Sequence, residues 1–339
     1  MTNTKSKKLK RRRSEIFSPL ACPAIDFQSL CSLTHMTAVQ SNIEEKYMFD
    51  QGVDTKFLGE SKSGASIYTG NLLAQFCIGS VPNGGYVASV MMNSVMQHYS
   101  KRHQKDPIAM NCFYTTKTKI GPCIVEVEDF KRSSKGYCLS RVLLKQPNDA
   151  SAGPLESVDN YNPDAYTLNV TAIFTFGNFA AEQGVNHIYK PASPPVRGEL
   201  QPMPWRFMND VVEGESDLTV FPANKQVPGR PELRHVARFK DQRPIDFTSL
   251  AFWCDMIVPP PMNLGPSILG GEVWAPTMQL ELIFKAVPKG KEVLCNFISR
   301  YIINGRYEMD GEIFDEDGKL LALTRHQCLV VPWSRNTKL

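Results

Sequence analysis

The residues that could bind a metal or form redox pairs are scattered through the sequence. None of the nine cysteines forms a C-x-x-C pair, and their number is odd. His98, His103 and His326 lack the spacing of a metal site. We therefore expect no metal, no cofactor, and a reduced compartment for the thiols.

Another kind of chemistry becomes available where a helix begins. Residues 82–86 read P-N-G-G-Y and lead into apolar residues at helical spacing. The first N–H groups of a helix have no partner inside it, so they can stabilise a developing oxyanion, and glycines allow a substrate to approach closely. This pattern makes Gly84, Gly85 and Tyr86 candidate substrate-binding residues.

The elements around this turn form one α+β unit, for which we expect residues 45–180. A buried helix over residues 82–99 is followed by runs rich in β-branched and aromatic residues, which predict strands. These runs cover residues 108–119, 123–131, 137–145 and 166–176. Residues 146–165 are polar and carry three prolines, which predicts an inserted surface loop.

The same order of elements returns in residues 246–339. Residues 246–258 have helical character and stop at three consecutive prolines, and strand-like runs follow at 277–286, 293–303, 306–314 and 320–331. The sequence E-D-G-K at 316–319 is typical of a hairpin turn. Residues 181–245 are proline-rich without a steady period, which predicts an interdomain linker. We expect two copies of one unit.

Composition and charge argue against a wholly disordered chain and against a nucleic-acid partner. An apolar fraction of 42% allows a real core. Of the net charge of +4, seven positive charges lie within the first 13 residues, and removing these seven leaves −3 for the rest. Runs of like charge are most often solvated tails, so we expect residues 1–44 to be mostly disordered, and no nucleic-acid partner.

The ends of the sequence and its hydropathy bear on location. No apolar run is long enough to cross a bilayer, and no apolar region follows the basic start as in a secretory signal. We expect a soluble intracellular protein. The ending Thr337-Lys338-Leu339 resembles the peroxisomal Ser-Lys-Leu signal, which favours a peroxisomal location beside a cytosolic one. Nuclear targeting by the basic tail is less favoured.

A long helix that begins at Asn-Gly-Gly-Tyr and is wrapped by an antiparallel sheet resembles the hotdog fold. Two such units in tandem are similar to the acyl-CoA thioesterase II family, over roughly residues 45–333 by the repeat above. The long block N-G-R-Y-E-M-D-G-E-I-F-D-E-D-G-K-L-L-A-L-T-R-H-Q carries most of the similarity. It departs in having His326 beside the glutamine.

The resemblance implies which residues hold the nucleophilic water. The family uses an Asp on the second helix, a Thr or Ser at the start of the next strand and a Gln on the last strand. These match Asp255 in F-W-C-D-M, Thr277 in A-P-T-M-Q and Gln327 in L-T-R-H-Q-C. A carboxylate can take the proton of the water, and a hydroxyl and an amide can orient it without added charge.

The resemblance therefore implies hydrolysis of an acyl-CoA, or of an acyl group on a carrier protein, within lipid metabolism. A hotdog dehydratase or hydratase would need an acidic residue paired with a histidine, and no histidine stands near Asp255 in the helix. A non-catalytic acyl-binding protein is a third alternative. Asp255 could also be structural, paired with Arg300 or Arg325. Pairing of whole chains into a homo-oligomer stays open.

Overall fold

The computed structural model describes residues 46–337 apart from 192, 225–226 and 256–257. The basic tail and the last two residues of Thr337-Lys338-Leu339 lie outside this part of the chain. The N-terminal half contains α1 (Met48–Val53), β1 (Thr55–Glu60), β2 (Ser66–Leu72), β3 (Cys77–Ile78), β4 (Val81–Pro82), α2 (Gly84–Tyr99), β5 (Asp106–Tyr114), β6 (Gly121–Lys131), β7 (Cys138–Pro147) and β8 (Tyr166–Gly177).

The C-terminal half repeats this order with a longer connection after its helix. It contains β9 (Gln201–Pro202), β10 (Val212–Ser216), β11 (Glu232–Phe239), α3 (Phe247–Trp253), α4 (Pro266–Leu269), β12 (Val273–Trp274), β13 (Thr277–Phe284), β14 (Glu292–Ile298), β15 (Ile302–Ile303), β16 (Arg306–Phe314), β17 (Leu320–Leu329), β18 (Val331–Pro332) and α5 (Ser334–Thr337).

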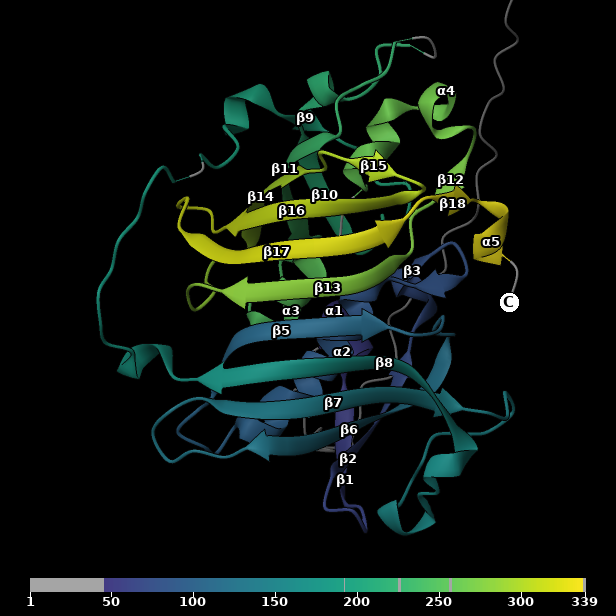
Figure 1. Ribbon diagram of the computed structural model, residues 1–339, viewed down its shortest axis with the longest axis vertical. Coiled ribbons are helices and arrows are strands. Elements are labelled where there is room, and N and C mark those ends of the chain that lie inside the picture. Colours follow the sequence, from purple (N-terminus) through teal and green to yellow (C-terminus); the bar gives the residue numbers. More distant parts are fainter. Residues whose placement is uncertain (1–45, 192, 225–226, 256–257, 338–339) are drawn as a thin grey trace, which may run out of the picture. The chain divides into compact units, whose positions relative to one another are not determined.

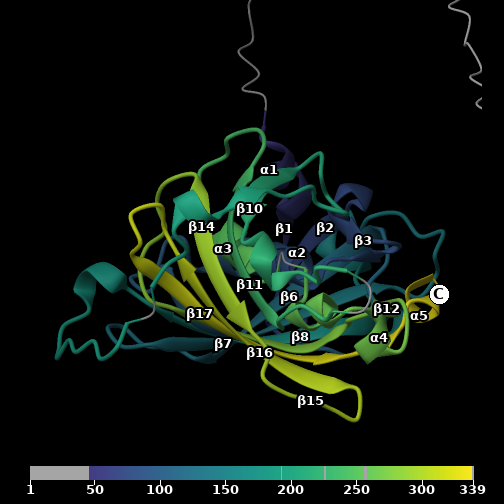
Figure 2. The same cartoon turned by 90° about the horizontal axis from the view of Figure 1, so that it is seen from above.

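One large antiparallel sheet joins the halves. Its strand order is β1-β2-β6-β7-β8-β5-β13-β17-β16-β14-β11-β10-β9 (Figure 1). Reading outward from the central β5–β13 pair, each half adds its strands in the same order, so the halves are related by an approximate twofold arrangement. The sheet curves around α2 and α3 (Figure 2). This is the double arrangement of helix and wrapping sheet that the sequence predicts.

Two hairpins, however, precede the helices and were not expected. β1 and β2 pair before α2, and β10 and β11 pair before α3. Because β11 also pairs with β14, residues 181–245 are not simply a linker, and part of that range completes the second sheet. The second helix is also shorter than residues 246–258, since it ends at Trp253, several residues before the prolines that cannot continue it.

The core lies between the helices and the concave face of the sheet. Met91, Met92 and Trp253 are fully buried, as expected of core residues. The alternation of buried and exposed positions along strands such as β17 puts one face of each strand in this core. Within the described residues, no helix is long and apolar enough to cross a membrane.

Candidate active site

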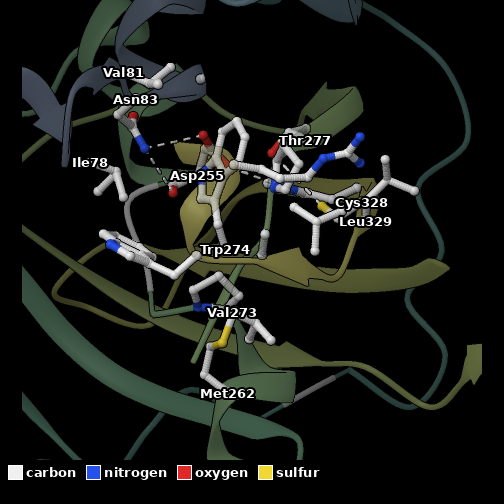
Figure 3. A pocket seen from close by; sticks show the side chains of 18 of the residues that line it. Ile78, Val81, Asn83, Asp255, Met262, Val273, Trp274, Thr277, Cys328 and Leu329 are labelled. Carbon is white, nitrogen blue, oxygen red and sulfur yellow. Dashed lines mark hydrogen bonds and ion pairs between the residues drawn. The ribbon is translucent and has the colours of Figure 1, made fainter. Parts of the chain in front are cut away.

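A cavity of about 800 Å³ opens beside the end of α3 and is lined by both halves of the chain. The N-terminal half contributes the start of α2 and the end of β5, and the C-terminal half contributes β13, β16, β17 and the segment after α3. Asp255, Thr277, His326 and Cys328 all face this cavity, and Figure 3 shows Asp255 between Asn83 and Thr277. The site is thus assembled from segments far apart in the sequence.

The carboxylate of Asp255 is held by the N-terminus of the other half's helix. The N–H of Gly85 donates to Oδ2 of Asp255 at 2.6 Å, and Nδ2 of Asn83 donates to the same oxygen at 3.3 Å. Asn83 also caps α2, because its Oδ1 accepts from the N–H of Tyr86. A negative charge at this position is favoured by the dipole of α2. The side chain of Asp255 is only 10% exposed.

Glycine at position 85 is required by this close approach. A Cβ atom on Gly85 would lie 2.7 Å from Cβ of Asp255 and within 3.0 Å of two carbonyl oxygens of α3. We therefore expect Gly85→Ala to separate the helices and to lower the free energy of unfolding by about 1–3 kcal/mol, as overpacking does. Urea denaturation measures this. Gly198→Ala is the matched control, because a Cβ there meets nothing within 4 Å; equal effects of the two would contradict the expectation.

His326 is the second partner of Asp255. Its Nε2–H donates to the carbonyl oxygen of Cys254 at 2.9 Å, and its Nδ1 lies 3.3 Å from Oδ1 of Asp255. That contact is an ion pair without good hydrogen-bond alignment, since Nδ1 has no hydrogen-bond partner by geometry. Burial alone would lower the pKa of His326, but the Asp255 carboxylate, together with the Cys328 side chain, outweighs it and raises the pKa to about 9. The raised pKa favours the protonated imidazolium beside the carboxylate.

This ion pair predicts a pH dependence of stability. Because the pKa of His326 is higher in the folded chain than in the unfolded one, its contribution is complete below about pH 6.5 and is lost as the pH rises through about 9. The wild type should lose up to about 3 kcal/mol relative to His326→Gln over this range. Urea unfolding of both proteins from pH 6 to 9.5 measures the difference. Buried thiols are common to both and cancel, so a constant difference would contradict the ion pair.

Thr277 begins β13 at an irregularity in the pairing with β17. Its Oγ1 lies 3.8 Å from Sγ of Cys328, which donates to it, and the hydroxyl faces the cavity. Cys328 is two residues beyond His326, so both side chains point to the same face of β17. Thr277 is thus brought to the same cavity as Asp255, as the sequence predicts.

Gln327 does not join them. It lies between His326 and Cys328 on β17, so strand alternation directs its side chain to the exposed outer face of the sheet. It does not line the cavity, where His326 stands instead. The helix itself carries no histidine near Asp255, as the sequence indicates, but the sheet brings His326 to this carboxylate from 71 positions away. Position 326 is the functional candidate that sequence reasoning missed.

Of the three candidate substrate-binding residues, one faces the cavity with an N–H left free by the described part of the chain, and the other two are engaged in contacts within the protein. Gly84 lines the cavity, and its N–H has no hydrogen-bond partner among the described residues. The N–H of Gly85 is taken by Asp255. Tyr86 is fully buried in the N-terminal core, where its hydroxyl donates to the carbonyl of Gly52 and its ring stacks on Phe76. Only Gly84 therefore remains available to a substrate.

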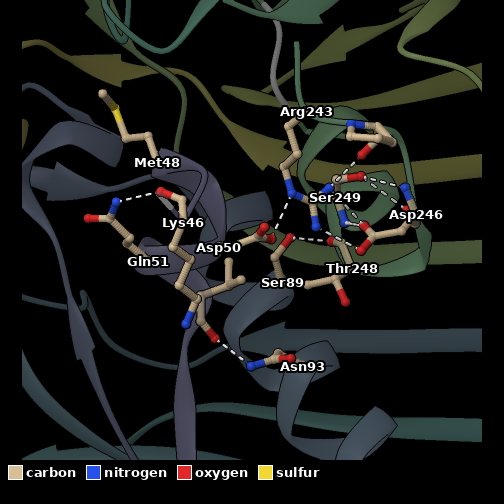
Figure 4. A network of polar contacts seen from close by, with 12 residues as sticks. Lys46, Met48, Asp50, Gln51, Ser89, Asn93, Arg243, Asp246, Thr248 and Ser249 are labelled. Carbon is tan, nitrogen blue, oxygen red and sulfur yellow. Dashed lines mark hydrogen bonds and ion pairs between the residues drawn. The ribbon is translucent and has the colours of Figure 1, made fainter. Parts of the chain in front are cut away.

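The short helix α3 is fixed in place by polar contacts to the N-terminal half (Figure 4). Asp246 and Ser249 form a capping box at its start. Arg243 donates to Asp246 and also to Asp50 of α1, at 2.7 Å in both cases. The hydroxyl of Ser89 on α2 donates to the carbonyl of Thr248 at 2.8 Å. A helix of seven residues is not stable by itself, so these contacts and its burial position Asp255.

Pairing of Asp255 with Arg300 or Arg325 is not observed. Arg300 and Arg325 both donate to Asp310 on the outer face of β16 and do not contact Asp255. In α2, the residue at the same distance from the N-cap as Asp255 in α3 is the buried Met92. The approximate twofold arrangement therefore carries this carboxylate in one half only. Among the described residues, no three His, Cys, Asp or Glu side chains cluster as a metal site would need.

Comparison with known proteins assigns the family. Residues 72–177 match the acyl-CoA thioesterase N-terminal domain, and residues 190–330 match the acyl-CoA thioesterase C-terminal domain. The chain is 24% identical over 314 residues to the thioesterase-like protein TwmA of Talaromyces wortmannii, covering 80% of this chain and 89% of that one.

Solved structures show the same fold. A putative thioesterase II from Thermobifida fusca matches with a TM-score of 0.67 and 18% identity, covering 85% of this chain and 98% of that one. A hotdog protein of unknown function from Alicyclobacillus acidocaldarius matches with a TM-score of 0.66 and 19% identity, over 84% and 98% of the two chains. The two domain matches together span more than half of the sequence, and the chain therefore belongs to the acyl-CoA thioesterase family of double hotdog proteins.

Proposed function

We propose that this protein hydrolyses acyl-CoA thioesters, or acyl groups on a carrier protein, with Asp255 as the base. The family and the fold support acyl thioester hydrolysis in general. The observation that carries the proposal is one carboxylate, 10% exposed, that faces a cavity large enough for a ligand and is held between a helix N-terminus and a buried histidine.

The proposed reaction needs only this chain's residues and water. Asp255 takes a proton from water as the oxygen of the water bonds to the thioester carbon. The C–S bond then breaks, and the proton held by Asp255 passes to the departing sulfur, which gives a carboxylic acid and a thiol and restores the carboxylate. The hydroxyl of Thr277 orients the water. Gly85, Asn83 and His326 hold the carboxylate in one orientation, and the unpaired N–H of Gly84 stabilises the oxyanion. In this proposal His326 orients the carboxylate, and Gln327, to which the sequence assigned the water, takes no part.

The rim of the cavity supports an anionic leaving group. Lys117, Arg206 and Arg335 all line it. The Lys117 ammonium lies 4.9 Å from the centre of the Trp274 ring, and the Arg206 guanidinium lies 5.2 Å from that of Trp333. Ammonium and guanidinium groups bind phosphates, and both CoA and the pantetheine arm of a carrier protein carry phosphate. Both leaving groups therefore belong in the test.

The contact between His326 and Asp255 also raises a second candidate, a dehydratase or hydratase of 3-hydroxyacyl thioesters. Such an enzyme needs a neutral imidazole to remove a proton from carbon. Here the Nε2–H of the imidazole is taken by the Cys254 carbonyl and Nδ1 lies beside Asp255, so neither nitrogen is left to take a proton from a substrate carbon. These observations favour hydrolysis.

The test is a panel of acyl-CoAs and acyl carrier proteins, including 3-hydroxyacyl forms, assayed for free thiol and for enoyl products. Thiol release from at least one class supports hydrolysis. Enoyl formation without thiol would support the dehydratase instead. Binding of acyl-CoA with neither product would support the non-catalytic alternative and overturn the proposal.

A further inference from the structure

The two central helices differ in length although the sheets around them are similar. α2 has 16 residues, whereas α3 has 7. At 1.5 Å per residue, α3 is shorter by roughly 13–14 Å. β16, which lines the cavity, is nearly as long as its counterpart β7, since the two have 9 and 10 residues. The inner face of the second sheet therefore extends beyond the end of its helix.

The cavity occupies this uncovered part of the sheet. Tyr307 and Met309 of β16, together with His326 and Cys328 of β17, line it from the sheet side. In the N-terminal half, α2 covers the corresponding region and its residues are packed into the core. Asp255 stands just past the last turn of α3 and faces the same space. A shortened helix thus leaves room for a ligand directly beside the carboxylate.

The opposite wall is a segment that the N-terminal half lacks. Only residues 100–105 connect α2 to β5, whereas residues 254–276 connect α3 to β13 and include the 3₁₀ helix η7 (Pro260–Leu264), α4 and β12. Met262 of η7, Leu269 of α4 and Trp274 of β12 line the cavity from this segment. On α4, Pro266 and Leu269 face the cavity, while Ile268 is 60% exposed and does not.

The cavity is apolar where it is buried and carries charged side chains where it is exposed, among them Glu272, which pairs with Arg206 at 3.8 Å. Trp205, Tyr307 and Met309 are at most 6% exposed. Arg206 and Arg335 are exposed. An acyl thioester has the same polarity, with a hydrocarbon at one end and phosphates at the other. Because the transfer of apolar groups out of water is favourable in free energy, we expect the acyl end to lie along the buried wall.

We propose that the acyl group occupies the space beyond the end of α3, and that Met262 and Leu269 in the connecting segment set which acyl groups fit. This proposal rests on the hydrolysis proposed above and adds where the acyl group lies. A larger side chain at either position removes volume from the cavity and leaves Asp255, Thr277 and His326 themselves unchanged. Acyl groups that need the full cavity are then excluded, while short ones still reach the carboxylate.

The test compares Leu269→Trp with Ile268→Trp, which adds similar bulk to the neighbouring exposed position of the same helix. The kcat/KM of each variant is measured on acyl-CoAs from two to sixteen carbons. Leu269→Trp should lower kcat/KM tenfold or more for the longest acyl groups that the wild type accepts and change it less than about threefold for the shortest, in keeping with pocket discrimination. Ile268→Trp should leave the whole profile within about twofold.

Equal loss at all chain lengths, or the same profile for both variants, would overturn the proposal. If Leu269→Trp fails to fold, Met262→Ala gives a test in the opposite direction, because enlarging the cavity should favour longer or bulkier groups. Acyl-CoA binding to Asp255→Asn, with and without Leu269→Trp, gives the same comparison by calorimetry without turnover. A wild type that hydrolyses nothing would sink the proposed function, whereas chain-length-independent binding would sink this inference alone.

Discussion

Asp255→Asn is expected to lower the turnover of thioester hydrolysis by about a hundredfold or more. The substitution removes the proton acceptor but keeps the shape of the side chain, and general base catalysis contributes effects of this size. The oxygen that accepts from Gly85 is retained if the amide is oriented correctly, so the N-terminus of α2 keeps its partner. Acyl-CoA binding should therefore change little. Steady-state kinetics and calorimetry separate the two quantities.

The control for this variant is Asp210→Asn, which alters the same chemical group at an exposed position outside the cavity. Thr277→Val should also lower turnover, and the double variant should lose much less than the product of the two losses, because both residues act on one water. Near-normal hydrolysis by a correctly folded Asp255→Asn protein would show that another group is the base. Multiplicative losses would show that Thr277 has a separate role.

His326→Leu is expected to lower turnover by tenfold to a hundredfold, whereas Gln327→Leu should stay within about twofold. Removing the imidazolium leaves Asp255 without its cation, and leaves the carbonyl of Cys254 without its donor. A buried group that loses its partner carries the full cost of its desolvation. Gln327 is exposed on the outer face of the sheet, so its loss does not disturb the carboxylate.

His326→Gln tests how the imidazole acts. The amide keeps a donor but carries no charge, so it should restore part of the activity lost in His326→Leu. Because the pKa of His326 is raised to about 9, the kcat of the wild type should change with pH above about pH 8. The His326→Gln variant should lack this change, because its amide does not titrate. The opposite ranking, with Gln327→Leu inactive and His326→Leu normal, would restore the assignment made from the sequence.

The elements that could be predicted are those with a strong local period. The helix at residues 84–99 and the eight strands assigned to the two halves follow from periods that neighbouring residues establish. The two hairpins before the helices were missed for a local reason as well. β1 is a short edge strand in which half of the residues are exposed, and β11 interrupts its alternation with three consecutive buried positions. Their pairing partners, not their own sequences, make them strands.

The local sequence of β17 contains enough information to show that His326, and not Gln327, faces the core. In the run L-A-L-T-R-H-Q-C, Arg325 is a residue that solvent-facing positions favour, and the period of two then places Gln327 outside and His326 inside. A shift by one residue moves every side chain to the other face of a strand. The inward position of His326 could therefore have been inferred from the sequence, because Arg325 beside it favours the solvent-facing side of the strand.

The sequence by itself determined the repeated order of helix and strands, the turn at Asn83-Gly84-Gly85, and the place of Thr277 at the start of its strand. It placed Asp255 within a helix over residues 246–258, whereas α3 ends at Trp253. Only the tertiary structure decided what those residues contact. Gly85 and Asp255 are 170 positions apart and meet because two helices pack closely enough to require glycine. The charge of His326 and the cavity beside α3 likewise depend on packing between distant segments, because burial and ion pairing are set by all the neighbours of a side chain and not by its own sequence context.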